Sequence, residues 1–169
     1  MADLVNICKL IDKGEGPVEE RRLQKEGVAD VAKYCYNTVE CRRTQVLAYF
    51  DEAFDPANCH KSCDNCCDDS EVYAEDMTAY AAKAIELLQS MVRTGVNVTQ
   101  RQAIDVFKGV NTSDLRQRGW DQMKLYGAGK DLTRDKVDRL FDALMLNTAI
   151  QTKLVGNAAG YSTTYVEVS

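Results

Sequence analysis

The sequence predicts a mainly α-helical protein that ends in a small β-hairpin. Two observations support this prediction: apolar residues recur at helical spacing through most of the 169 residues, and β-type residues alternate mainly near the C-terminus. With 45% hydrophobic and 28% charged residues, the composition is that of a globular protein. No apolar run approaches the roughly 18 to 20 residues that a membrane-spanning helix needs. The length suits one ordinary domain or two small ones.

Three helices are expected in the first 51 residues. The first covers residues 3–12 and is broken by the segment GEGP, and the second runs from there to about Tyr36. The third covers roughly residues 38–51. On the second helix, the side chains expected to be buried are Leu23, Val28, Val31 and Cys35.

An acidic connector, DDSEVYAED, occupies residues 68–76 and marks the expected boundary between domains 1–70 and 71–169. A helix is predicted over residues 76–93, followed by a short β-like step. Thr99 and Gln102 then have the spacing of a capping box, which opens a helix that ends before Gly109.

The end of the sequence completes the pattern of a known motif. Thr133 is expected to cap one more helix. Two β-type runs, Ile150–Val155 and Tyr161–Val168, are joined by GNAAG, which is a hairpin signal. Helix, short strand, helix, helix and hairpin is the order of elements in a winged-helix domain.

The net charge of −5 is distributed unevenly along the chain. Residues 1–94 carry 11 basic and 18 acidic side chains, whereas residues 95–169 carry 10 basic and 8 acidic ones. The basic excess lies between Lys108 and Arg139. This polarity permits a nucleic-acid-binding face on the C-terminal half, but it is weaker than that of a polybasic tail.

A cluster of cysteines gives the strongest chemical signal. Four of them lie within 26 residues at the spacing C-x17-C-x3-C-x2-C. The absence of a secretory signal predicts an intracellular protein with reduced thiols, and zinc prefers four such ligands in a closed, structural site. His60 and Cys67 each adjoin a ligand and stay open as replacements for it. The predicted zinc ligands, which make the N-terminal part a helical zinc-binding platform, are Cys41, Cys59, Cys63 and Cys66.

The residues around these cysteines resemble a known family. The string YCYNTVECRRTQVLAYFDEAF, followed by CDNCC, is similar to the zinc-binding subdomain of RecQ-family DNA helicases. The segments DVFKG, LTRDKVDRLFDALM and GYSTTYVEV resemble the RecQ C-terminal (RQC) region, nearest the Bloom-type branch and its fungal relatives. Asp51 stands where the family usually has Gly. The resemblance covers roughly residues 30–169 and implies a zinc-bound helical platform followed by a winged helix.

The resemblance implies a non-catalytic DNA-binding segment of an ATP-dependent 3′→5′ DNA helicase. Such a segment would bind duplex or forked (junction) DNA, adjoin the rest of the helicase core, and act in DNA repair and recombination in the nucleus. The sequence has no G-x-x-x-x-G-K-[ST] phosphate loop, so ATP hydrolysis is expected only of a longer parent protein. Two alternatives remain open: a protein-interaction module that the zinc unit only braces, and a free-standing zinc-containing transcription regulator.

The expected DNA contacts lie at helix ends and at the tip of the hairpin. A winged helix grips phosphates with side chains and with backbone amides near helix N-termini. For the lysines and arginines the alternative is a solvated helix face, and Tyr161 can either stack on an unpaired base or pack within its strand. Arg139 has aspartates at helical spacing and can simply pair with them. The candidate contacts are Lys108, Asn111, Thr112, Ser113, Thr133, Arg134, Lys136, Asn157 and Tyr161.

Overall fold

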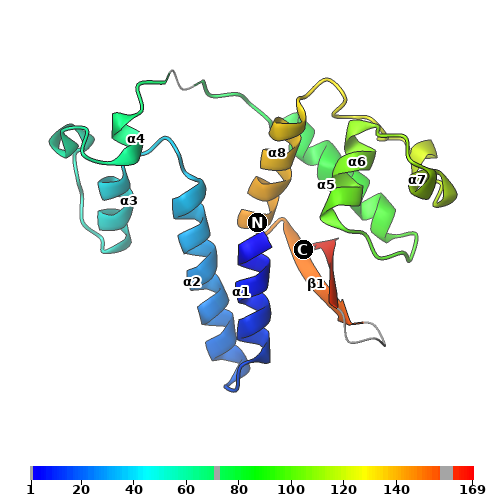
Figure 1. The fold of residues 1–169 in the computed structure, drawn as a ribbon, viewed down its shortest axis with the longest axis horizontal. Coiled ribbons are helices and arrows are strands. Elements are labelled where there is room, and N and C mark those ends of the chain that lie inside the picture. Colours follow the sequence, from blue (N-terminus) through cyan, green and yellow to red (C-terminus); the bar gives the residue numbers. More distant parts are fainter. Residues whose placement is uncertain (1, 71–72, 157–161) are drawn as a thin grey trace. The chain divides into compact units, whose positions relative to one another are not determined.

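The computed structural model describes residues 2–70, 73–156 and 162–169. The chain forms two compact units, Met1–Glu75 and Asp76–Ser169. In the described part the fold is mainly helical with one small antiparallel sheet, which confirms the predicted fold class (Figure 1). No helix among the described residues is long and apolar enough to cross a membrane.

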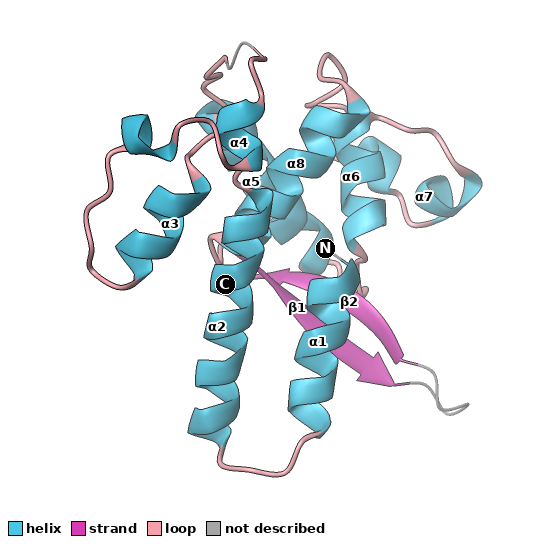
Figure 2. Cartoon of the chain, turned by 60° about the vertical axis from the view of Figure 1, so that its left-hand side comes forward, coloured by secondary structure: helices cyan, strands magenta, loops and turns pink. Residues whose placement is uncertain are grey.

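The first unit consists of a helical hairpin and a cysteine-rich end. Helices α1 (Ala2–Lys13) and α2 (Val18–Tyr36) run antiparallel to one another (Figure 1). Helix α3 (Arg42–Tyr49), a single 3-10 turn η1 (Pro56–Cys59) and the short helix α4 (Asp64–Cys67) follow (Figure 2).

Helix α3 is shorter than the predicted range 38–51 at both ends. The side-chain oxygen of Asn37 accepts hydrogen bonds from the backbone N–H groups of Val39 (3.1 Å) and Glu40 (3.0 Å). Such a local turn competes with helix formation before Cys41. At the other end, Asp51 has φ 58°, a left-handed conformation that stops the helix.

The prediction that the apolar side chains of α2 are buried is wrong. None of the α2 residues is buried, and Leu23 and Val31 are 55% and 63% exposed. Among the described residues of the first unit, Cys41 and Cys59 are the buried ones. The described residues of this unit therefore form no conventional hydrophobic core, and its order has to come from the cysteines and from polar contacts.

The second unit has the main helices and the C-terminal hairpin that were predicted for a winged-helix domain. The predicted β-like step after its first helix is not a strand, and a short helix at Ser113–Gln117 was not predicted. Strands β1 and β2 pair antiparallel, with Ile150 opposite Val168. The N–H of Val166 donates to the carbonyl of Val98 at 2.8 Å, which attaches the hairpin to the segment before α6. The elements are α5 (Thr78–Val92), α6 (Gln100–Lys108), α7 (Ser113–Gln117), the 3-10 turn η2 (Trp120–Gln122), α8 (Arg134–Leu146), β1 (Ile150–Gly156) and β2 (Ser162–Val168).

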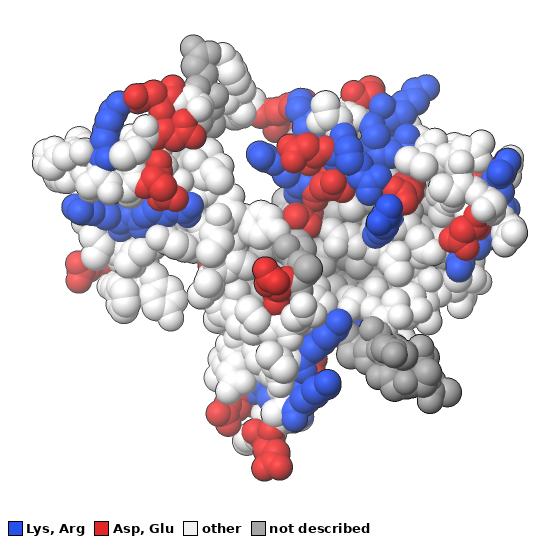
Figure 3. Space-filling view, in the orientation of Figure 1, with Lys and Arg blue, Asp and Glu red and all other residues white. Residues whose placement is uncertain are grey.

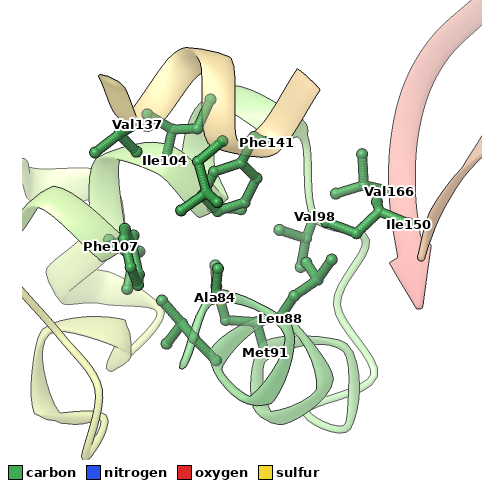
Figure 4. Packing of buried hydrophobic residues seen from close by; sticks show 14 of the residues in the cluster. Ala84, Leu88, Met91, Val98, Ile104, Phe107, Val137, Phe141, Ile150 and Val166 are labelled. Atoms are coloured by element: carbon green, nitrogen blue, oxygen red, sulfur yellow. The ribbon is translucent and has the colours of Figure 1, made fainter. Parts of the chain in front are cut away.

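The hydrophobic core of the protein lies inside this second unit. Figure 4 shows α5, α6 and α8 turning their apolar faces toward one another, with Ile150 and Val166 closing the side of the hairpin. The rings of Phe107 and Phe141 meet edge to face with centroids 5.9 Å apart. This aromatic pair packs α6 against α8 within the core.

The backbone at Asp51 leads to a first prediction. Glycine adopts a φ of 58° without the steric cost that Asp has there. We expect Asp51→Gly to raise the free energy of unfolding of the zinc-loaded chain by about 0.5–1 kcal/mol. Urea unfolding followed by circular dichroism measures the change. Glu52→Gly, at a position without this positive φ, is the control and should destabilise; a loss of stability in Asp51→Gly would contradict the explanation.

Candidate metal centre and nucleic-acid interface

The four clustered cysteines come together in the folded first unit. Their Sγ atoms all lie within 4.8 Å of one another. They come from three local elements, and two of them, Cys63 and Cys66, belong to the same short helix. Cys41 precedes α3, Cys59 ends η1, Cys63 caps the N-terminus of α4 and Cys66 lies within α4. Two ligand positions are buried and two are half-buried.

This donor set fits one zinc ion. Four thiolates around zinc at about 2.3 Å form a tetrahedron with sulfur–sulfur edges of about 3.8 Å, which is compatible with four sulfurs that all lie within 4.8 Å of one another. The two possible replacements lie elsewhere: the side chain of His60 is exposed, and the exposed Cys67 thiol donates to the carbonyl of Lys61 at 2.6 Å. With four protein ligands the site is closed, which makes the zinc structural.

The loop between the second and third cysteines is held in an unusual backbone conformation. His60 and Lys61 are both left-handed, with φ 48° and 53°. The hydroxyl of Ser62 donates to the carbonyl of Cys59 at 2.6 Å and lies 3.4 Å from the Sγ of the same residue. Two successive non-glycine residues in the left-handed conformation cost free energy. The loop therefore needs an additional interaction, such as bonds to a metal ion, to hold this conformation.

The electrostatics of the cluster also favour a cation. Without metal, the hydrogen bond with Ser62 lowers the pKa of Cys59 to about 6, whereas the adjacent Cys63 sulfur raises the pKa of Cys66 to about 12. A hydrogen bond from the backbone N–H of Arg42 lowers the pKa of Cys63 as well, so the cluster favours two thiolates and opposes the ionisation of Cys66 beside them. A divalent cation supplies the positive charge that lets all four sulfurs ionise together.

Arg42 joins the cysteine cluster to the helical hairpin. Its guanidinium binds both carboxylate oxygens of Asp64 at 3.0 Å, stacks over the ring of Tyr34 at 4.7 Å and donates to the carbonyl of Tyr34. From α4, the Asn65 side chain adds bonds to the carbonyls of Asn37 (2.9 Å) and Glu40 (2.7 Å). Arg42 therefore has a structural role in this unit.

The candidate DNA contacts of the second unit fall at the ends of three helices. Lys108 ends α6, Asn111 to Ser113 lead into α7, and Thr133 to Lys136 open α8. The two threonines act as helix caps: the Thr112 hydroxyl accepts from Leu115 N–H (3.4 Å) and the Thr133 hydroxyl from Lys136 N–H (3.3 Å). Asn157 and Tyr161 lie outside the described residues.

Two of the candidate cations are already engaged within the protein. The ammonium of Lys108 donates to the carbonyls of Gly129 (3.4 Å), Lys130 (3.1 Å) and Leu132. The guanidinium of Arg134 pairs with Asp105 at 2.6 Å and Asp138 at 3.2 Å, and Asp105 raises its pKa. Arg139 pairs with Asp135 at 3.1 Å, as its spacing allowed.

The sequence reading missed one cation that the fold brings to this region. Lys130 is exposed, and its carbonyl accepts from Lys108, so the two lysines are neighbours across the loop before α8. Figure 3 shows Lys and Arg gathered over α6 and the beginning of α8, with Asp and Glu among them. The turn-prone string YGAGKD, which ends two residues before the Thr133 cap, was the signal that could have pointed to Lys130.

Comparison with known proteins gives two family matches that together cover nearly the whole chain. The profile described as RecQ zinc-binding matches residues 1–67, and the one described as RQC domain matches residues 71–169. The four-cysteine cluster lies inside the first match and the winged-helix elements inside the second.

Individual relatives agree with these matches. The chain is 37% identical over 164 residues (97% of its length) to the ATP-dependent DNA helicase hus2/rqh1 of Schizosaccharomyces pombe, and 36% identical over 152 residues (89%) to the ATP-dependent helicase SGS1 of Saccharomyces cerevisiae. It is 26% identical over 182 residues to the RecQ-like DNA helicase BLM of Xenopus laevis. The chain spans 12%, 10% and 13% of these relatives. It belongs to the RecQ family of DNA helicases, of which it carries the zinc-binding segment and the RQC domain.

Proposed function

We propose that this chain is the non-catalytic DNA-binding part of an ATP-dependent 3′→5′ RecQ helicase. The zinc unit holds the helical platform, and the winged helix binds the backbone of duplex, forked or junction DNA during repair and recombination in the nucleus. Its other partner is the ATP-hydrolysing core of the parent protein. The relatives named above are DNA helicases, which supports this assignment.

One observation carries the DNA-binding part of the proposal. The end of α6, the loop before α8 and the first turn of α8 meet, so that Lys108, Lys130 and Lys136 share one region of the second unit. Exposed cations beside a helix N-terminus suit phosphate oxygens. Lys108 is bonded to three carbonyls, and we assign it to holding the loop. Lys130 and Lys136 are exposed side chains at this helix N-terminus, and we assign phosphate contact to them.

Lys136→Ala should lower the affinity for a forked DNA duplex about three- to tenfold, because one phosphate contact is lost. Fluorescence anisotropy at several salt concentrations measures the affinity. The slope of log affinity against log salt concentration should decrease in magnitude by about 1, because one counterion fewer is released. Lys124→Ala, which removes an exposed lysine paired with Glu86 at 3.6 Å, is the matched control and should change neither quantity. Unchanged affinity in Lys136→Ala would leave that lysine as a solvated side chain.

A second candidate function is a protein-docking winged helix. The ion pairs of Arg134 and Arg139 with aspartates neutralise much of the α8 surface, which favours this alternative. The same titration decides between the two. Affinity that falls steeply with salt supports DNA binding through phosphates, whereas no measurable affinity at low salt supports the protein partner.

A further inference from the structure

An apolar groove of about 520 Å³ lies between α2 and α3 in the first unit. Three of its large side chains, Val31, Tyr49 and Phe50, are 63%, 74% and 64% exposed. Tyr34 and Val46 complete its apolar lining. Single exposed apolar residues are ordinary, but several of them gathered around one groove mark a binding surface.

Two aromatic side chains, Tyr49 and Phe50, form one wall of the groove and pack against each other. The rings of Tyr49 and Phe50 meet edge to face at 5.2 Å and 88°. The left-handed turn at Asp51 directly follows and sets the direction in which the chain leaves α3. A wall of this kind offers large contact area at little cost in side-chain entropy, as is typical of the centre of a binding site.

A glycine in the middle of α2 points to the shape of what binds. Gly27 lines the groove, and a Cβ placed on it would meet nothing within 4 Å. Glycine inside a helix costs about 1 kcal/mol relative to alanine, and none of the described neighbours of Gly27 requires it here. A bare backbone at this point lets another helix approach α2 closely, because the distance between helix axes depends on the side chains at the contact.

The charges around the groove point to the chemistry of the partner. Asp30 is neutralised by Lys33 at 3.2 Å. Lys33 and Glu40 line the groove as well, so its charged lining residues leave a net charge of −1, and the exposed Asp51 and Glu52 directly follow the lining residue Phe50 in sequence. A partner with basic side chains beside its apolar face complements these acidic side chains.

We propose that the groove binds an amphipathic helix of a protein partner, with apolar side chains at i, i+4 and i+7 in the groove and Lys or Arg on the flanks. This interaction lies in the zinc unit and is separate from the DNA contacts of the winged helix. The zinc-binding unit would then dock a protein partner in addition to its structural role.

A synthetic 14-residue peptide of leucine and lysine with helical amphipathic order tests the proposal. Isothermal titration into the zinc-loaded chain should give a Kd on the order of 10 μM. Gly27→Leu fills the groove at an exposed helix position and should weaken binding at least tenfold without loss of the fold. Glu20→Leu is the matched control, since it adds the same side chain to an exposed α2 position outside the groove lining, and should leave the Kd unchanged.

Two peptide controls and two further measurements decide the outcome. A peptide of the same composition in non-amphipathic order, and one with glutamate in place of lysine, should each bind at least tenfold more weakly. Equal binding by either peptide, or by Gly27→Leu, overturns the proposal. A dimer of the chain that Gly27→Leu abolishes in sedimentation experiments would assign the groove to a second copy. Loss of peptide binding in the full parent protein would assign it to a segment of the same polypeptide.

Discussion

Replacing Cys63 with Ser is expected to release the zinc and unfold the first unit. Ser is a poor zinc ligand, and the remaining three thiols no longer close the tetrahedron. Structural zinc contributes about 10–16 kcal/mol to the folding of small domains, and Cys41 and Cys59 are the buried residues among those described in the first unit. Elemental analysis should find about one zinc per chain in the unchanged protein and almost none in the variant.

The second unit should survive this change, because its core contains no residue of the cysteine cluster. Hydrogen exchange measured by mass spectrometry should therefore show protection lost from α1 to α4 and kept in α5, α6 and α8. Cys67→Ser is the control: its thiol is exposed and bonded to the Lys61 carbonyl, so zinc and fold should both be retained. Stoichiometric zinc in Cys63→Ser would disprove the ligand assignment.

The cysteine cluster could be predicted because its information is local. Two of its three intervals are short, and a loop rich in Asp and Asn offers no core in which to bury thiols. The capping box of Thr99 and Gln102 and the Thr133 cap were predictable for the same reason, and both form. The hydrogen bond between Arg42 and Asp64 could not be predicted, since it spans 22 residues and depends on how the cysteine-rich loop folds back onto α3.

The sequence could not predict which apolar side chains are buried or which charged side chains pair across the fold. Periodicity identifies the apolar face of α2 but not what covers it, and in this structure Leu23 and Val31 stay exposed. Likewise, the sequence shows that lysines and arginines are frequent from residue 108 onward, but it does not show which groups they bind. Lys108 turned out to be held by three carbonyls more than 20 residues away, and Arg134 by the carboxylate of Asp105 on another helix.

Gly129→Ala is expected to destabilise the second unit by about 3 kcal/mol or more, at the upper end of overpacking effects. A Cβ at this position would lie 2.2 Å from Cε1 of Phe107, whose ring is fully buried against Phe141. The loop cannot move away easily, because the N–H of Gly129 donates to the carbonyl of Phe107 at 2.9 Å. Thermal unfolding of the second unit measures the loss, and Gly156→Ala, where a Cβ would meet nothing within 4 Å, is the control.

A second substitution separates the clash from other effects of Gly129→Ala. Phe107→Leu removes the ring atoms that the new methyl group would strike, so the double variant should be more stable than the sum of the two single changes predicts. Strict additivity would rule out the clash as the cause. The carbonyls of Gly129 and Lys130 also hold Lys108, and Thr133 begins α8 three residues later. Gly129→Ala should therefore weaken binding to forked DNA as well, and Phe107→Leu should restore part of that affinity along with the stability.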